Sequence, residues 1–202
     1  SVARHMFRLM DPISQRMMGL RADMTTQVAR IAAPRLRQAP RPLRLCYAGQ
    51  VLRVRGSQLR PERQYAQAGV ELIGADGVAG DAEVVLLAAE ALQALGVQGL
   101  SVDLTAPSLV PLLTQSLGLE GSEAEAARQA LDARDGAAIE TLVPHVRQQL
   151  GDLMRAAGPA DSALECLAGL ALPAPARALC DHLADLVAWL NKHNGGLTLT
   201  ID

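Results

Sequence analysis

The amino-acid sequence predicts an α+β fold, with an antiparallel sheet and flanking helices in the first half and a largely helical second half. Residues 43–54 and 62–73 alternate in polarity on either side of a short loop that contains Gly56 and Ser57. This pattern is typical of a long antiparallel hairpin. From Pro107 onward, Ala and Leu recur at helical spacing. Half of the residues are hydrophobic, so the chain can bury a core.

The elements around the hairpin follow from local signals. Asp81 is expected to cap a helix at 82–95, which ends at Gly96 because glycine favours the conformation found after a helix. The buried stripe of this helix is predicted from the spacing of its apolar residues Leu86, Leu87, Ala91 and Leu95. The other elements expected in this half are strands at 7–10, 17–21 and 101–104 and a helix at 26–36.

The second half is predicted to consist of helices and one closing strand. Ser122 and Glu125 have the spacing of a capping box, which opens a helix that runs to about residue 134. A helix at 136–150 should break or kink near Pro144, because proline removes a backbone donor. The remaining elements are helices at 161–170 and 174–192 and a strand at 197–201.

Charge is unevenly distributed along the chain, although the net charge is only −2. Residues 1–70 hold 13 arginines and 3 acidic residues, a net charge of +10, whereas residues 71–202 hold 6 basic and 18 acidic residues, a net charge of −12. A basic half can indicate a nucleic-acid face, an anion pocket or a partner surface. Aromatic residues make up only 2% of the chain, which does not favour a nucleic-acid partner that stacks its bases.

Metal binding, secretion and membrane insertion are not indicated. Cys46, Cys166 and Cys180 are far apart and form no CxxC pair, so we expect reduced, buried thiols without a metal or disulfide. No apolar run approaches the length of a membrane span, and no signal peptide is visible. We therefore expect a cytoplasmic protein with no membrane contact.

A candidate ligand site lies on the hairpin. Gln67, Gly69 and Glu71 are two residues apart, so they share one face of a strand. Arg53 comes from the preceding strand. A guanidinium can meet an anionic oxygen and a carboxylate can meet an ammonium, so this combination suits a zwitterion such as an amino acid.

The hairpin resembles motif 2 of the class II aminoacyl-tRNA synthetases, in the histidyl-tRNA synthetase branch, where the pattern is approximately FRxERPQxGRxREFHQxGxExxG. The chain follows this pattern without a gap at Leu52, Arg53, Gln67, Gly69, Glu71 and Gly74. Upstream, the segment LRADMT at 20–25 stands where these synthetases have LRPEGT. The resemblance covers residues 6–105 well and the remainder in outline.

The resemblance implies a class II synthetase-like antiparallel sheet with flanking helices and a helical insertion. The implied organisation is a core at 1–106 with its hairpin at about 43–74, an insertion at 107–196 and a strand at 197–202 that returns to the core sheet. Motif 1 is not recognisable before Phe7 and motif 3 is not seen after the last strand. We therefore expect that the chain is partial.

Departures from the synthetase pattern point to one branch of the family. Arg55 replaces the glutamate that helps to hold adenine, Gln64 replaces a later glutamate and Ala66 replaces a histidine. These changes put ATP activation in doubt. The amino-acid side of the pocket is retained in Asp23, Thr25, Arg53, Gln67 and Glu71. This combination resembles the regulatory subunits of ATP phosphoribosyltransferase, which are catalytically silent synthetase relatives in histidine biosynthesis.

That resemblance implies a non-enzymatic role without catalytic residues or a cofactor. The implied partners are the short catalytic ATP phosphoribosyltransferase subunit and a second copy of the regulator, with histidine as a possible effector. The alternatives are a fragment of a true histidyl-tRNA synthetase and a stand-alone amino-acid-binding module. Asp23 and Thr25 could instead cap the helix that follows them, and the effector could bind at the subunit interface.

Overall fold

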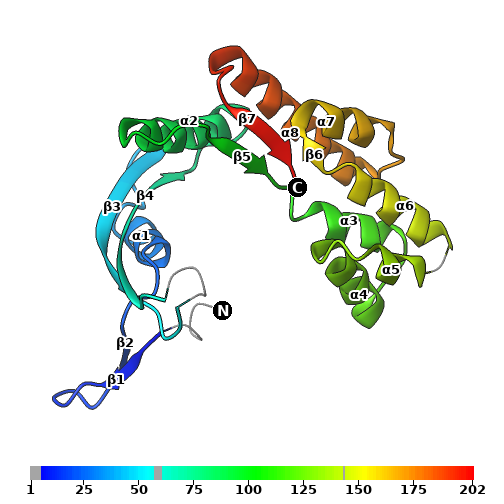
Figure 1. The fold of residues 1–202 in the computed structure, drawn as a ribbon. Coiled ribbons are helices and arrows are strands. Elements are labelled where there is room, and N and C mark those ends of the chain that lie inside the picture. The colour runs from blue at the N-terminus through cyan, green and yellow to red at the C-terminus, as the bar shows by residue number, and fades with distance from the viewer. Residues whose placement is uncertain (1–5, 57–60, 143) are drawn as a thin grey trace. The chain divides into compact units, whose positions relative to one another are not determined.

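A computed structural model describes residues 6–56, 61–142 and 144–202 (Figure 1). The chain forms two compact units, Ser1–Asp76 and Gly77–Asp202. The domain boundaries expected from the sequence, at residues 106 and 196, stay predictions. Ser57 of the hairpin loop lies outside the described residues.

The first unit contains two antiparallel hairpins and one helix. Its elements are β1 (Arg8–Met10), β2 (Met17–Gly19), α1 (Thr25–Ala32), β3 (Leu43–Leu52) and β4 (Gln64–Ile73). β1 pairs with β2, and β3 pairs with β4 over ten residues. The long hairpin expected from the sequence is therefore confirmed. α1 ends four residues earlier than expected, because Pro34 has no backbone N–H to continue the helix.

The register of the long hairpin decides which side chains share a face. Leu43 pairs with Ile73 at one end and Leu52 with Gln64 at the other. Because paired residues of an antiparallel ladder point to the same side, the odd-numbered residues of both strands form one face. α1 and the segment before it contact this face, since the backbone N–H of Met24 donates to the Gln67 side chain.

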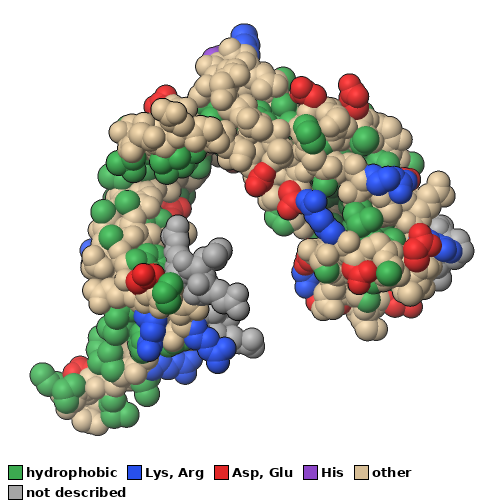
Figure 2. Space-filling model, in the orientation of Figure 1, with side chains coloured by type: hydrophobic (Ala, Val, Ile, Leu, Met, Phe, Trp, Pro, Cys, Tyr) green, Lys and Arg blue, Asp and Glu red, His purple; other side chains and the backbone are tan. Residues whose placement is uncertain are grey.

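The short β1–β2 hairpin is largely apolar and exposed. Figure 2 shows hydrophobic side chains gathered over it, and its exposed members are Leu9, Met10, Ile13, Met17 and Met18. In the same view, basic side chains gather on the lower part of this unit.

The second unit is mostly helical and encloses a small sheet. Its helices are α2 (Val78–Ala94), α3 (Leu109–Ser116), α4 (Gly121–Asp132), α5 (Gly136–Glu140), α6 (Pro144–Arg155), α7 (Ala160–Gly169) and α8 (Ala174–His193). Its strands are β5 (Ser101–Leu104), β6 (Gly158–Pro159) and β7 (Thr198–Ile201), in the order β5-β7-β6. β7 runs parallel to β5 and antiparallel to β6.

The start and the buried stripe of α2 differ from the prediction. The helix begins at Val78 after Gly77, so Asp81 lies in the first turn and is not the cap. Leu87 is 43% exposed and Leu95 is 81% exposed. The buried residues Gly80, Ala82 and Ala89 are small, and Ala82 and Ala89 belong to the core cluster that contains the buried residues of α8. Of the predicted stripe, Leu86 packs against the core, whereas Leu87, Ala91 and Leu95 are exposed and were predicted wrongly. Gly96, which has φ +84°, follows the helix as expected.

The capping box predicted at the start of α4 does not form. The helix begins at Gly121, and Glu120 precedes it without a side-chain capping bond. The Glu125 carboxylate instead accepts hydrogen bonds from Arg128 and Gln129, so it is not free to return to the helix start. The break near Pro144 is confirmed, since Pro144 is the first residue of α6.

The core of the second unit is built largely from α8 and its neighbours. Leu190 and Ala176 of α8 are fully buried and pack with residues of α2, α7 and the sheet. A second cluster joins α3, α4, α5 and α6 around Leu113 and Leu150. Cys180 is buried, and burial raises the pKa of its thiol. Cys46 and Cys166 are exposed, contrary to the expectation that all three thiols would be buried.

Candidate amino-acid pocket

The predicted pocket residues come from three places in the first unit. Gln67 and Glu71 lie on β4, Arg53 follows β3 directly, and Asp23 and Thr25 stand at the start of α1. Gln67 and Glu71 share the odd-numbered face of the hairpin. The ladder continues beyond β3, because the backbone N–H of Arg53 donates to the carbonyl of Arg63 over 2.8 Å.

Gln67 joins β4 to the start of α1 by two hydrogen bonds. Its Nε2 donates to Oδ2 of Asp23 over 3.1 Å, and its Oε1 accepts from the backbone N–H of Met24 over 3.1 Å. Both ends of the side-chain amide are therefore used, which fixes its orientation. The residues it connects are more than forty positions apart in sequence, so this contact depends on the fold of the whole unit.

Asp23 is held as an anion. The hydrogen bond from Gln67 lowers the pKa of Asp23 below its usual value, and partial burial opposes this shift. Hydrogen bonds from Thr25 and the positive charge of Arg53 lower that pKa further. A carboxylate kept ionised in this way can accept hydrogen bonds from an ammonium group.

Asp23 also stabilises the first turn of α1. Its Oδ1 accepts from the backbone N–H of Thr25 over 2.8 Å, while Met24, the residue before the helix, makes no side-chain capping bond. The capping role considered from the sequence is therefore present for Asp23. The Thr25 hydroxyl also lies 3.4 Å from the Tyr47 hydroxyl. The role of either residue in ligand binding stays a prediction.

Arg53 is oriented by a ring and a carbonyl. Its Cζ lies 5.3 Å from the centre of the Tyr65 ring, a cation–π distance, and its Nε donates to the carbonyl of Ala22 over 3.4 Å. Ala22 precedes Asp23, so this contact brings the guanidinium to the same end of the face as Asp23 and Gln67. The side chain is exposed, which leaves its remaining N–H groups available for an anion.

Glu71 stands apart from the other four residues. It pairs with Leu45 and is half-buried, and it makes no hydrogen bond or ion pair with any residue that the structure describes. Four residues along a strand separate the Cα atoms of Gln67 and Glu71 by about 13 Å. The structure therefore brings together Asp23, Thr25, Arg53 and Gln67 and places Glu71 at a second position further along the same face.

Sequence reasoning missed Tyr47, which lies between these two positions. Tyr47 pairs with Gly69, the residue midway between Gln67 and Glu71. The signal was available in the pairing of the two strands, because a register that pairs Leu43 with Ile73 also pairs Tyr47 with Gly69.

The three departures from the synthetase pattern occupy different surroundings. Gln64 and Ala66 are even-numbered and exposed, on the face of β4 opposite to Gln67. These two changes therefore do not alter the candidate pocket directly. Arg55 is exposed beyond the last ladder pair.

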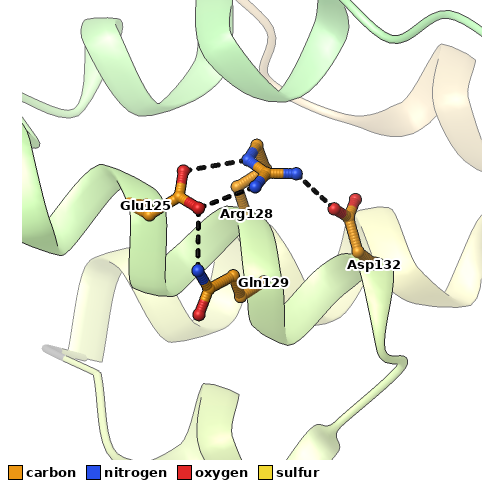
Figure 3. A network of polar contacts seen from close by, with 4 residues as sticks. All are labelled: Glu125, Arg128, Gln129 and Asp132. Carbon is orange, nitrogen blue, oxygen red and sulfur yellow. Dashed lines mark hydrogen bonds and ion pairs between the residues drawn. The ribbon is translucent and has the colours of Figure 1, made fainter. Parts of the chain in front are cut away.

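The second unit contains polar contacts on and between its helices. Figure 3 shows Arg128 of α4 between Glu125 and Asp132, with Gln129 beside Glu125. Hydrogen bonds from Arg128 and Gln129 lower the pKa of Glu125 to about 2. The side chains are exposed and three or four residues apart, so they support the helix. His182 of α8 lies 2.6 Å from Asp81 of α2, which links these helices.

Two cavities of about 630 and 440 Å³ also lie in the second unit. Leu109 and Leu153 line the larger cavity, and Leu104 and Leu179 the smaller one. None of the predicted pocket residues lines either cavity. Within residues 6–56, 61–142 and 144–202, no group of three or more His, Cys, Asp or Glu is placed to hold a metal ion. No helix in the same ranges is long and apolar enough to cross a membrane.

Comparisons with known proteins agree on one family. The family model described as histidyl-tRNA synthetase matches residues 1–202. An ATP phosphoribosyltransferase regulatory subunit from Paramagnetospirillum magneticum is 55% identical over 97% of the chain, and another from Rhodospirillum centenum is 52% identical over 100%. The chain spans 52% of the length of each of these curated relatives.

A solved structure shows the same fold. The structure of an ATP phosphoribosyltransferase regulatory subunit/histidyl-tRNA synthetase from Bacillus halodurans is 26% identical and matches with a TM-score of 0.85. The match covers 100% of this chain and 53% of that one. The class II synthetase-like fold expected from the sequence is confirmed.

Proposed function

This chain belongs to the histidyl-tRNA synthetase family, and on that premise we propose that it is part of a regulatory subunit of ATP phosphoribosyltransferase. In this role the protein is not itself an enzyme. It associates with the short catalytic subunit, enables its activity and makes it sensitive to histidine, the end product of the pathway. We expect the protein in the cytoplasm, because this is the usual location of a biosynthetic complex.

The observation that carries this proposal is the similarity to proteins named as such subunits, at 52–55% identity over nearly all of the chain. The family model alone would not separate a regulator from a synthetase, because it is described as histidyl-tRNA synthetase. The chain spans about half of the relatives' length. The activity and the partners of the whole protein therefore belong to the proposal.

The geometry of the first unit supports an amino-acid pocket. Asp23, held ionised by Gln67, provides an anionic acceptor for an ammonium group. Arg53, positioned by Tyr65 and Ala22, provides a cation for a carboxylate. Glu71 on the same face can accept a hydrogen bond from an imidazole N–H. Histidine carries all three of the groups that these side chains would recognise.

The adenine side of a synthetase site is altered. Arg55 stands where synthetases have a glutamate, and it is exposed. A cation here cannot accept a hydrogen bond from the adenine amino group. We therefore expect amino-acid recognition without activation of the amino acid by ATP.

Feedback by histidine requires that the two states of the complex bind it with different affinities. A ligand shifts an equilibrium only by its differential affinity for the states. The hairpin pocket is one place for this effect, and the interface with the catalytic subunit is the other. Self-association of the regulator would place several such sites in one assembly.

Co-expression tests the assignment. We expect the full-length protein to copurify with the short catalytic subunit and to elute with it as one complex from a size-exclusion column. A matched sample in which the regulator is expressed alone serves as the control. If the two proteins elute separately under all conditions that keep both folded, the regulatory assignment is wrong.

The second candidate is a histidyl-tRNA synthetase, which the description of the matching family model favours. ATP–pyrophosphate exchange with histidine distinguishes the two functions. We expect no histidine-dependent exchange by the full-length protein, because of Arg55. Exchange well above background would establish the synthetase alternative.

A further inference from the structure

The ring of Tyr47 lies across Gly69. A Cβ atom added to Gly69 would meet the Tyr47 hydroxyl oxygen and would lie 2.5 Å from Cζ and 3.0 Å from Cε2 of the ring. Carbon atoms do not approach each other this closely without a shift of the ring or the strand. A glycine at this position of β4 therefore provides the space that the tyrosine occupies.

This arrangement places a hydroxyl group in the middle of the candidate pocket. Gly69 stands two residues from Gln67 and two residues from Glu71 on the same face. The Tyr47 hydroxyl thus lies between the end of the pocket that holds Asp23 and the end that holds Glu71.

Among the residues that the structure describes, the Tyr47 hydroxyl has one polar contact, the Thr25 hydroxyl at 3.4 Å. This distance is beyond the usual range for an O–H···O hydrogen bond. A phenolic hydroxyl can both donate and accept. The ring is half-buried, so the group is positioned by packing and still has hydrogen-bonding capacity.

We propose that Tyr47 is a specificity-determining residue of the amino-acid pocket. Its ring forms the floor over Gly69, and its hydroxyl contacts a ligand that extends from Asp23 and Gln67 to Glu71. The ligand class is a zwitterionic amino acid whose side chain ends in a hydrogen-bond donor, as imidazole does. This inference rests on the proposed pocket and adds the residue that fixes how the ligand lies along it.

The position of the Tyr47 ring also explains how the pocket would discriminate between amino acids. A ligand must place its ammonium at Asp23 and its side-chain donor at Glu71 while it passes over one rigid ring. Without the ring, an open space is left above Gly69, and longer cationic side chains can then bend into it. Removal of the ring is therefore expected to reduce the preference for histidine over lysine.

Calorimetric titration of L-histidine into the full-length protein tests the proposal. Tyr47→Phe keeps the ring and removes one hydrogen bond, so we expect a three- to tenfold weaker affinity. The melting temperature should be unchanged, because the hydroxyl contributes little to packing. Cys46→Ala is the matched control, since Cys46 is the neighbouring residue on the opposite, exposed face of β3. Its affinity should equal that of the wild type.

A second pair of variants tests the same idea through Gly69. Gly69→Ala should displace the ring, lower the melting temperature and weaken histidine binding by at least tenfold. Adding Tyr47→Ala removes the clash, so the melting temperature should recover while the affinity stays low. Recovery of the affinity in this double variant would overturn the proposal.

The outcomes separate this inference from the proposed function. Unchanged affinity in folded Tyr47→Phe, with histidine bound by the wild type, refutes the contact between the Tyr47 hydroxyl and the ligand. Recovered affinity in the Gly69→Ala, Tyr47→Ala double variant refutes the role of the ring. Either result leaves the pocket intact. A wild-type protein that assembles with the catalytic subunit but binds no histidine refutes both the pocket and Tyr47, and leaves the subunit assignment standing.

Discussion

Replacement of Gln67 by alanine tests the contact that holds the candidate pocket together. The change removes the donor to Asp23 and the acceptor for the Met24 N–H. A neutral hydrogen bond contributes about 0.5–1.5 kcal/mol and one to a charged group about 1.5–3 kcal/mol. Asp23 is only partly buried, so water replaces much of the second bond. We therefore expect a net loss of about 1–2 kcal/mol in the free energy of unfolding.

The same variant should alter the titration of Asp23. The Gln67 hydrogen bond is the largest cause of the lowered pKa of Asp23, so its loss should raise that pKa toward the ordinary value of 3.8. Because the folded-state pKa is depressed, the stabilisation is present above the unfolded-state pKa and is lost as pH falls through the folded-state value. The difference in stability between wild type and Gln67→Ala should therefore shrink below about pH 4.

Two measurements on the full-length protein check this reasoning. Denaturant unfolding at several pH values gives the stability difference, and NMR titration of the carboxyl groups gives the pKa of Asp23. Gln64→Ala is the matched control, because Gln64 lies on the same strand but on the other, exposed face. An unchanged pKa of Asp23 together with unchanged stability would refute the account of the network.

Further predictions concern the pocket, the α4 surface and the core. Glu71→Gln should weaken histidine binding by about 1.5–3 kcal/mol without a change in melting temperature, and calorimetry checks this. Glu125 should titrate at about pH 2, and Arg128→Ala should move its pKa toward 4.5, measured by NMR. Leu190→Ala should cost about 2–5 kcal/mol in unfolding experiments, because Leu190 is fully buried. Leu95→Ala, at an 81% exposed position, should have little effect.

The long hairpin could be predicted because its signal is local. Alternation along residues 43–54 and 62–73 gives the strands, and the pattern of polar positions gives the face that carries Gln67 and Glu71. The start of α1 was found for a similar reason. The contact between Gln67 and Asp23 could not be derived, because it joins segments that only the folded unit brings together.

The errors also have physical reasons. For α2, the apolar period selected Leu87 and Leu95, but the residues of α2 that are buried in the core cluster with α8 are the small Ala82 and Ala89. For α4, Ser122 and its acidic partner have capping-box spacing, but basic and amide side chains further along the helix compete for the same carboxylate. In both elements a tertiary or side-chain contact outweighs a correct local preference.

For the pocket, too, local sequence signals identified some of the residues and the folded structure was needed to find the others. The residue types were selected from their chemistry, and the structure places Asp23, Arg53 and Gln67 at one end of a face. The spacing along β4 separates Glu71 from them. Tyr47, which lies in between, carries no charge and resembles a core residue in the sequence. Its role becomes visible only through its strand partner, Gly69.

The rate of the catalytic ATP phosphoribosyltransferase subunit, measured with and without the full-length protein, tests the central claim most directly. We expect the rate to rise when the two proteins are combined and to fall again when histidine is added to the complex. A catalytic subunit whose rate does not respond to the added protein, with or without histidine, would contradict the assignment.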